Sequence, residues 1–212
     1  MTRLKHPHTP HMPFSRSRTD DDKVLKTMAH FVGRSGVATK KMDGENTSFY
    51  RDGFHARSID SRHHPSRDWV AAFHGRIAHE IPDGWRIGGE NLYARHSLGY
   101  DDLPSYFLGF FVWDEHNVAL GWDDTLDFFQ AIGISPVPEI EGTRGLFDEK
   151  KLRALARGWN VERDEGFVYR VEGPICFEDF GLSVAKWVRP RHVQTNEHWM
   201  HQAVVPNGLL RA

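Results

Sequence analysis

Short apolar segments alternate with tight-turn dipeptides along most of this chain, and this texture constrains the fold more than any other feature. Between residues 37 and 58 the segments are broken by Asp43-Gly44 and Asp52-Gly53, dipeptides that favour tight turns between strands. Further strand candidates lie at 85–95, 106–113, 118–122, 166–171 and 182–188. Because these segments adjoin turns and not regular crossover helices, the pattern predicts an α+β fold with mainly antiparallel sheets and flanking helices.

Helical spacing of apolar residues is confined to four stretches. Thr19 and Asp20 form a candidate helix cap before an apolar series that ends at Gly33, and other helices are expected at 66–79, 124–131 and 148–157. Residues 1–18 lack periodicity and are rich in Pro, His and Arg, so we expect an extended basic N-terminal arm. Residues 19–212 then form a single domain, which suits a chain of 212 residues.

Cysteine content and hydropathy restrict the setting in which the chain works. Cys176 is the only cysteine, which excludes an internal disulfide and a cysteine-rich zinc site and favours a reducing, cytoplasmic compartment. No apolar run approaches the roughly 18 residues of a membrane-spanning helix. The first 20 residues also lack the apolar centre of a signal peptide, so we expect no membrane association.

Charge is distributed unevenly along the sequence. The net charge of −2 argues against a dedicated nucleic-acid coat protein, because affinity for a phosphate backbone comes mainly from clustered Lys and Arg. Residues 101–149 nevertheless carry eleven acidic side chains against Arg144 alone, and residues 185–212 carry four basic ones against Glu197. The folded chain could show one acidic and one basic face, although two ordinary solvated surfaces explain the split equally well.

Lys41 is the first candidate for chemistry. It stands at the end of a probable strand, after Lys40 and before Asp43-Gly44, where a hairpin would aim its amine at a bound phosphate. A lysine nucleophile must be neutral when it attacks, and its pKa falls when it is desolvated or placed beside other cations. By itself this short pattern fits a solvated hairpin lysine better, so its interpretation depends on the rest of the sequence.

Further motifs, which follow one another along the chain in a known order, change that interpretation. Lys41-Met42-Asp43-Gly44 resembles motif I of the covalent nucleotidyltransferases, the superfamily of RNA ligases, DNA ligases and mRNA capping enzymes. Counterparts of the later motifs are Arg57-Ser58, the segment 85–93 with Glu90, the aromatic segment 106–113 with Phe110, Glu165 with the segment that follows it, and 184–189 with Lys186. The segment 85–93 is similar to that of small bacterial and phage-type RNA ligases, so the resemblance favours an ATP-dependent RNA ligase.

The resemblance implies a reaction and a role for each matching residue. Lys41 would attack the α-phosphorus of ATP and carry AMP, which passes to a 5′-phosphate RNA end before a 3′-hydroxyl seals the strand. Lys186 would contact the α-phosphate and lower the pKa of Lys41, and Glu165 would help to hold Mg²⁺ or Mn²⁺. The remaining nucleotide-binding residues implied by the resemblance are Asp43, Gly44, Arg57, Glu90 at the ribose and Phe110 on the purine.

Three positions depart from the motif pattern. Lys40 stands where these ligases often carry a Glu close to the purine, which leaves the nucleotide donor open. Phe111 replaces an expected Asp in the aromatic segment. Lys186 and Arg189 are three residues apart, whereas the basic residues of motif V usually stand two apart.

Several alternatives stay open at this level. The chain could be a DNA nick ligase, an end-capping nucleotidyltransferase, or a non-catalytic nucleic-acid-binding module of the same fold. The histidines of the arm, or His198 with His201, could be metal ligands, although a third ligand at a recognisable spacing is lacking. About 25 residues follow the last motif, so the resemblance implies a ligase domain of the ATP-grasp-like type without an OB domain. An end-healing kinase-phosphatase would be a partner in RNA repair, and the oligomeric state is undetermined.

Overall fold

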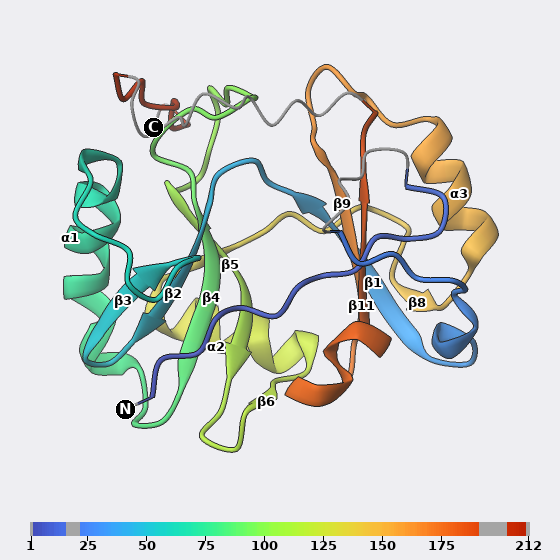
Figure 1. Ribbon diagram of the computed structural model, residues 1–212, viewed down its shortest axis with the longest axis horizontal. Coiled ribbons are helices and arrows are strands. Elements are labelled where there is room, and N and C mark those ends of the chain that lie inside the picture. The colour runs from blue at the N-terminus through green and yellow to red at the C-terminus, as the bar shows by residue number, and fades with distance from the viewer. Residues whose placement is uncertain (1, 16–21, 191–202, 211–212) are drawn as a thin grey trace.

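The strands of the protein form two sheets that lie side by side, with helices packed against them (Figure 1). The computed structural model describes residues 2–15, 22–190 and 203–210. The first sheet has four strands in the order β11-β9-β1-β8. The second has seven, six of them in the order β10-β6-β5-β4-β2-β3 and β7 paired with β5.

The first sheet brings three strand ends together at one edge. Its strands are β1 (Ser35–Lys41), β8 (Gly145–Leu146), β9 (Gly166–Val171) and β11 (Val184–Val188). β9 pairs with β1 on one side and with β11 on the other, and both pairings are antiparallel. In this register Lys41 and Val188 both lie opposite Gly166, so the last residue of β1 is placed beside the start of β9.

The second sheet is a meander built on its three longest strands. Its strands are β2 (Glu45–Tyr50), β3 (Gly53–Ala56), β4 (Arg86–Asn91), β5 (Phe107–Trp113), β6 (Val118–Ala119), β7 (Ser135–Pro136) and β10 (Ile175–Cys176). Every pairing between these strands is antiparallel except that of β5 with β7. The predicted α+β class with mainly antiparallel sheets is therefore confirmed.

Three α-helices form close to their predicted positions. They are α1 (Asp68–Ile77), α2 (Trp122–Ile132) and α3 (Glu149–Arg157), and short 3-10 helices form at Ala29–Phe31, Pro65–Arg67, Ala78–Glu80 and Phe177–Leu182. Asp148 caps α3 by accepting a hydrogen bond from the backbone N–H of Lys150 at 2.8 Å. Among the described residues no helix is both long and apolar enough to cross a bilayer.

The helix expected before Gly33 is wrong over the described residues 22–32, where only Ala29–Phe31 is helical. The N–H of Leu25 donates to the carbonyl of His11 at 2.9 Å, and the N–H of His11 donates to the carbonyl of Lys23 at 2.7 Å. The backbone here pairs with the N-terminal segment and does not form helical bonds. Met28 and Phe31 are buried in the core, which explains why the apolar residues recur.

The hairpin predicted at Asp43-Gly44 is also wrong, because β1 belongs to the first sheet and β2 to the second. The link between them crosses from one sheet to the other. Gly44 allows the backbone of this link to lie close to β4, since a Cβ at this residue would lie 2.5 Å from the carbonyl oxygen of Asn91. The second predicted turn is confirmed, because β2 and β3 pair with Tyr50 opposite Gly53.

Helices and sheets enclose three apolar clusters. One lies between the second sheet and the helices α1 and α2, and it includes Phe49, Phe73 and Phe129. A second packs α3 and the N-terminal segment on the first sheet and reaches Phe111 of β5, so it joins the two sheets. The third lies around residues 92–108. The cluster that reaches Phe111 therefore packs the two sheets against each other.

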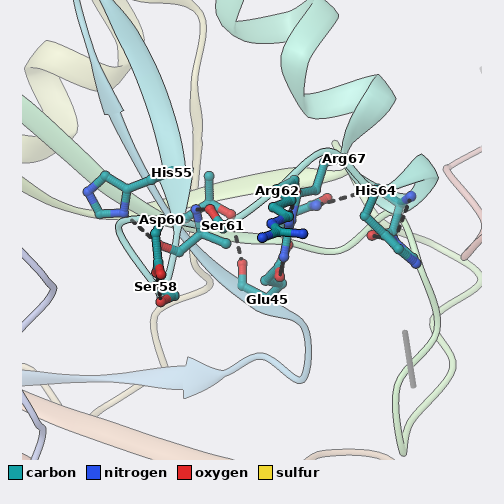
Figure 2. Close-up of polar contacts among 12 residues, drawn as sticks. Glu45, His55, Ser58, Asp60, Ser61, Arg62, His64 and Arg67 are labelled. Carbon is teal, nitrogen blue, oxygen red and sulfur yellow. Dashed lines mark hydrogen bonds and ion pairs between the residues drawn. The ribbon is translucent and has the colours of Figure 1, made fainter. Parts of the chain in front are cut away.

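The start of β2 is fixed by an ion pair with the segment that precedes α1. Figure 2 shows Arg67 and Glu45 directed at one another beside the loop that carries Ser58, Asp60 and Arg62. The Arg67 guanidinium donates to both carboxylate oxygens of Glu45, with Nε 2.7 Å from Oε2, and also to the carbonyl of Arg62. Each side chain of the pair is 10% exposed. The contact therefore ties β2, the loop and α1 into one unit.

Replacement of Arg67 by Ala should destabilise the fold by about 3 kcal/mol, because it leaves the Glu45 carboxylate buried without its partner. Urea unfolding measures the change in the free energy of unfolding. Arg163→Ala is a matched control, since the Arg163 side chain is 69% exposed and its ion pair with Asp102 lies at the surface. Equal stability of the two variants would contradict the structural role of the Arg67 pair.

Candidate active site

A cavity of about 470 Å³ opens between the two sheets, within the size range of small-ligand pockets. Five of the residues expected from the sequence line it: Lys41, Arg57, Glu90, Phe110 and Lys186. The N-terminal segment contributes a further wall through residues 6–9. In Figure 1 this dark-blue segment passes in front of the second sheet before it reaches the first. The arm is thus part of the site.

Lys41 is held at the cavity by a buried carboxylate. Its Nζ donates to Oε2 of Glu165 at 2.6 Å, and the Glu165 side chain is only 3% exposed. Glu165 immediately precedes β9, and the pairing of Lys41 with Gly166 sets the two side chains next to each other. Glycine is required at residue 166, because a Cβ there would lie 2.1 Å from the carbonyl oxygen of Trp187 on β11.

The charges around Lys41 favour its protonated form. Burial by itself would lower the pKa of Lys41, but Glu165, Glu90 and Asp43 outweigh it and hold the pKa above its ordinary value. Burial, with a smaller contribution from Glu165 and Asp43, raises the pKa of Glu90 to about 8, although Lys41 opposes this shift. We expected Lys186 to lower the pKa of Lys41. In the protein without ligands, the surrounding carboxylates instead raise it.

The carboxylates at this end of the cavity fit a divalent cation. Glu165, Glu90 and Asp43 all act on Lys41, and the Glu165 carboxylate lies 2.6 Å from its amine. Mg²⁺ in proteins commonly takes one or two carboxylates together with phosphate oxygens and water. Among residues 2–15, 22–190 and 203–210 no group of three His, Cys, Asp or Glu side chains could hold a metal alone. A cation here would therefore need oxygen atoms from a bound phosphate.

The possible zinc site in the N-terminal arm is thus not formed within the described residues. His11 instead contacts Asp22, and the ring of His6 packs on Phe110 and Phe180. The other proposed pair, His198 and His201, lies outside the described residues.

Asp43 orders the loop after the lysine. Its Oδ2 accepts hydrogen bonds from Ser97 Oγ at 2.6 Å and from the N–H of Leu98 at 2.7 Å, and its own N–H donates to the Tyr100 hydroxyl at 2.9 Å. Asp43 therefore fixes the backbone between β1 and β2 with its carboxylate turned toward residues 97–98. The structure assigns it a positioning contact, whereas the sequence left open a contact with phosphate.

Lys186 and Arg57 are two of the basic side chains that line the cavity. Lys186 comes from β11 and lies 3.3 Å from Asp22 Oδ1. Burial lowers the pKa of Lys186, and the charges of Lys41 and Arg57 lower it further, whereas Asp22 raises it. Arg57 follows β3 and lies 3.4 Å from the ring of His8. These cations suit an anionic group placed between the two sheets.

Aromatic side chains form the wall of the cavity on the β5 side. Phe110 is half-buried and contacts the ring of His6 at 5.3 Å between centroids. Arg170 of β9 reaches beneath them and donates to the carbonyls of Phe110 at 3.1 Å and Leu120 at 2.9 Å. Its guanidinium lies 4.3 Å from the Phe111 ring centroid, and burial lowers its pKa to about 9. The aromatic that replaces the expected Asp thus packs on a buried cation.

No role was assigned to Asp22 or Arg170 from the sequence, and His8 was marked only as one of the arm histidines that could bind a metal, yet all three line the cavity. Arg170 stands in the segment that follows Glu165, where a basic residue inside an apolar strand was the available signal. Asp22 stands far from every motif, so no local pattern marked it as a cavity residue.

A model of one protein family, described as RNA ligase, matches residues 34–188, which is more than half of the chain. The chain belongs to the RNA ligase family. The matched region begins just before β1 and ends with β11, so it contains Lys41, Glu90, Glu165 and Lys186. A search of curated proteins found no match to this sequence.

Solved ligases share the fold of this RNA ligase family member at low sequence identity. An archaeal ATP-dependent RNA ligase has a TM-score of 0.57 and 15% identity, over 87% of this chain and 48% of its own. A mutant RNA ligase of Naegleria gruberi, solved with ATP and Mn, has a TM-score of 0.55 and 17% identity, over 88% of this chain and 62% of its own. A putative ATP-dependent DNA ligase of Aquifex aeolicus has a TM-score of 0.52, 16% identity, and coverage of 88% and 50%. The chain spans about half the length of the archaeal RNA ligase.

Lys40 and Arg189, which depart from the motif pattern, both make local contacts in this RNA ligase family member. Lys40 lines the cavity and its Nζ lies 3.0 Å from Asp164 Oδ1, so its charge is paired. The Arg189 side chain donates to the carbonyl of Val161, which directs it toward residues 161–165. Lys186 is therefore the motif V cation that lines the cavity.

The C-terminal segment holds the loop that binds Asp43. Asn207 is buried, accepts from the N–H of Tyr100 at 2.8 Å and donates to the carbonyl of Leu92 at 2.7 Å. Asn207→Ala should lower the free energy of unfolding by about 2 kcal/mol, because buried backbone groups lose their partners. Urea unfolding tests this, with Val205→Ala as control because Val205 is 54% exposed. A change as small as that of the control would contradict the role of Asn207.

Proposed function

We propose that this domain is an ATP-dependent RNA ligase that works through a covalent lysyl-AMP on Lys41. The observation that carries the proposal is the placement of the Lys41 amine, paired with Glu165, at a cavity that Glu90, Lys186 and Arg57 also line. Phosphoryl transfer depends mainly on positioning and on neutralisation of phosphate charge, and these are the two properties that such a site supplies.

In the first step the Nζ of Lys41, after loss of a proton, attacks the α-phosphorus of ATP. A phosphoramidate bond forms, the bond to the β-phosphate oxygen breaks, and pyrophosphate leaves. Lys186 would contact the α-phosphate oxygens. Glu90 would bind the ribose hydroxyls, and Phe110 would stack on the purine. Glu165 would help to hold a divalent cation, Mg²⁺ or Mn²⁺, which supplies neutralisation of phosphate charge when it is bound.

The remaining steps return Lys41 to its free amine. The oxygen of a 5′-phosphate RNA end attacks the phosphorus of the lysyl-AMP, so that AMP is joined to the end through a pyrophosphate bond and the amine leaves. A 3′-hydroxyl then attacks the 5′-phosphate, a phosphodiester bond forms, and AMP leaves. We place this activity in RNA repair in the cytoplasm, where an end-healing kinase-phosphatase would prepare the two ends.

The test is incubation of the protein with ATP labelled at the α-phosphate and Mg²⁺ or Mn²⁺, followed by denaturing electrophoresis. We expect label that stays on the protein and is released by added pyrophosphate. Absence of label with each of the four ribonucleoside triphosphates would leave only the non-catalytic binding module. Nicked RNA, nicked DNA and single-stranded RNA, compared as substrates, then separate an RNA ligase from a DNA ligase.

A further inference from the structure

The N-terminal segment is joined to β11 at the residue that would contact the α-phosphate. The N–H of Lys186 donates to the carbonyl of Pro10, and the N–H of Met12 donates to the carbonyl of Lys186, each at 2.8 Å. Met12 is fully buried in the core cluster of the first sheet. Figure 1 shows the dark-blue segment meeting the first sheet beside β11. Residues 10–12 therefore act as an added strand at this edge.

A chain of hydrogen bonds fixes the ring of His11. Ser15 Oγ accepts from the N–H of Val188 at 3.1 Å and lies 2.9 Å from His11 Nδ1. The neutral ring can carry its proton on Nε2, with Nδ1 accepting from the serine hydroxyl. Nε2 lies 3.2 Å from Asp22 Oδ1. Burial, with the charge of Lys186, lowers the pKa of His11 to about 4, so the ring is neutral and donates to Asp22.

Asp22 connects His11 with Lys186. Its Oδ1 also lies 3.3 Å from Lys186 Nζ, and both side chains line the cavity while remaining about three quarters or more buried. The other charged or titratable groups that act on Lys186, or on which it acts, are Lys41 of β1, Arg57 after β3, and His8 and His11 of the N-terminal segment. Asp22 is the acidic group that acts on Lys186. It raises the pKa of Lys186, whereas burial and the neighbouring cations lower it.

We propose that Asp22, oriented by His11, is a positioning residue that keeps Lys186 charged and directed into the cavity for the α-phosphate. The inference rests on the proposed function and extends it, because it adds the N-terminal segment to the phosphate-binding machinery. Asp22 acts through Lys186 and need not touch the nucleotide. A neutral residue at this position would leave Lys186 to lose its proton at a lower pH.

The test is the pH dependence of lysyl-AMP formation by Asp22→Asn, measured with labelled ATP between about pH 6 and pH 10. Wild-type protein should lose activity at alkaline pH as Lys186 deprotonates, and Asp22→Asn should shift this alkaline limb down by about one unit. The rise in the KM for ATP should approach tenfold only at pH values above the wild-type alkaline limb, and it should be much smaller at pH 6.5, where Lys186 stays charged in both proteins. Asp102→Asn is the control, because the Asp102 side chain is 59% exposed in a surface ion pair.

A second variant separates this role from a merely structural one. In Lys186→Arg the guanidinium stays charged across this pH range, so adding Asp22→Asn should no longer move the alkaline limb. An alkaline limb that does not move in Asp22→Asn alone would overturn the inference. Tighter ATP binding by Asp22→Asn would also overturn it, because it would mean that Asp22 competes with phosphate. Wild-type protein that forms no lysyl-AMP would instead overturn the proposed function, so the two failures are distinguishable.

Discussion

Lys41→Ala is expected to form no lysyl-AMP, a loss of at least about 10³-fold relative to the unmodified chain. The lysine amine is the only group in the proposed mechanism that can carry AMP, and it lies 2.6 Å from the Glu165 carboxylate. The measurement is the amount of labelled AMP retained on the protein after denaturing electrophoresis. Lys150→Ala is the control, because Lys150 is exposed on α3.

A second substitution guards against loss of the fold. Removal of Lys41 takes its cation away from the buried Glu165 carboxylate, which is destabilising. Lys41→Arg keeps a positive charge at that carboxylate, but a guanidinium is not a nucleophile at any usable pH. We therefore expect Lys41→Arg to fold and to remain unlabelled. Label on Lys41→Arg comparable to that on the unmodified protein would rule out Lys41 as the carrier.

The residues that the sequence identified are those inside short motifs. Lys41, Glu90 and Lys186 each stand in a strand or at its end, and each of these strands was predicted close to its observed position. Ordered motifs define a site even when the contacts between them are unknown, because the family resemblance supplies the arrangement. The chain alone gave no sign that Glu165 would bond Lys41 at 2.6 Å.

Long-range pairing accounts for the features that the sequence did not predict. A turn signal such as Asp43-Gly44 says that the chain bends, but it does not say which sheet the next strand joins. The apolar spacing before Gly33 suited a helix, yet hydrogen bonds between His11 and residues 23–25 replaced the local pattern. His8 and Asp22 reach the cavity only through this pairing, so no window of the sequence contained both them and β11.

The charge around Lys41 leads to the last prediction, which concerns Glu165→Gln in buffer without ATP or divalent cations. Glu165 is the largest charged influence that raises the pKa of Lys41, after the opposing effect of burial. Replacement of its carboxylate by an amide should therefore lower that pKa. The rate at which an amine-reactive reagent modifies Lys41, followed by peptide mass spectrometry across pH, should show a midpoint above about 10.5 in the unmodified protein and a lower one in the variant.

The same substitution should nevertheless reduce lysyl-AMP formation roughly 10²-fold, because the phosphates lose a carboxylate that would hold the divalent cation. A more reactive amine in a slower enzyme would separate the nucleophile's basicity from the neutralisation of phosphate charge.

The raised pKa of Lys41 also makes the stability of the fold depend on pH, with a definite sign. A raised folded-state pKa contributes stability that is complete below the unfolded value of about 10.4 and is lost as the pH rises through the folded value. The unmodified protein should therefore lose more stability than Glu165→Gln at strongly alkaline pH, and an equal loss would contradict the ion pair.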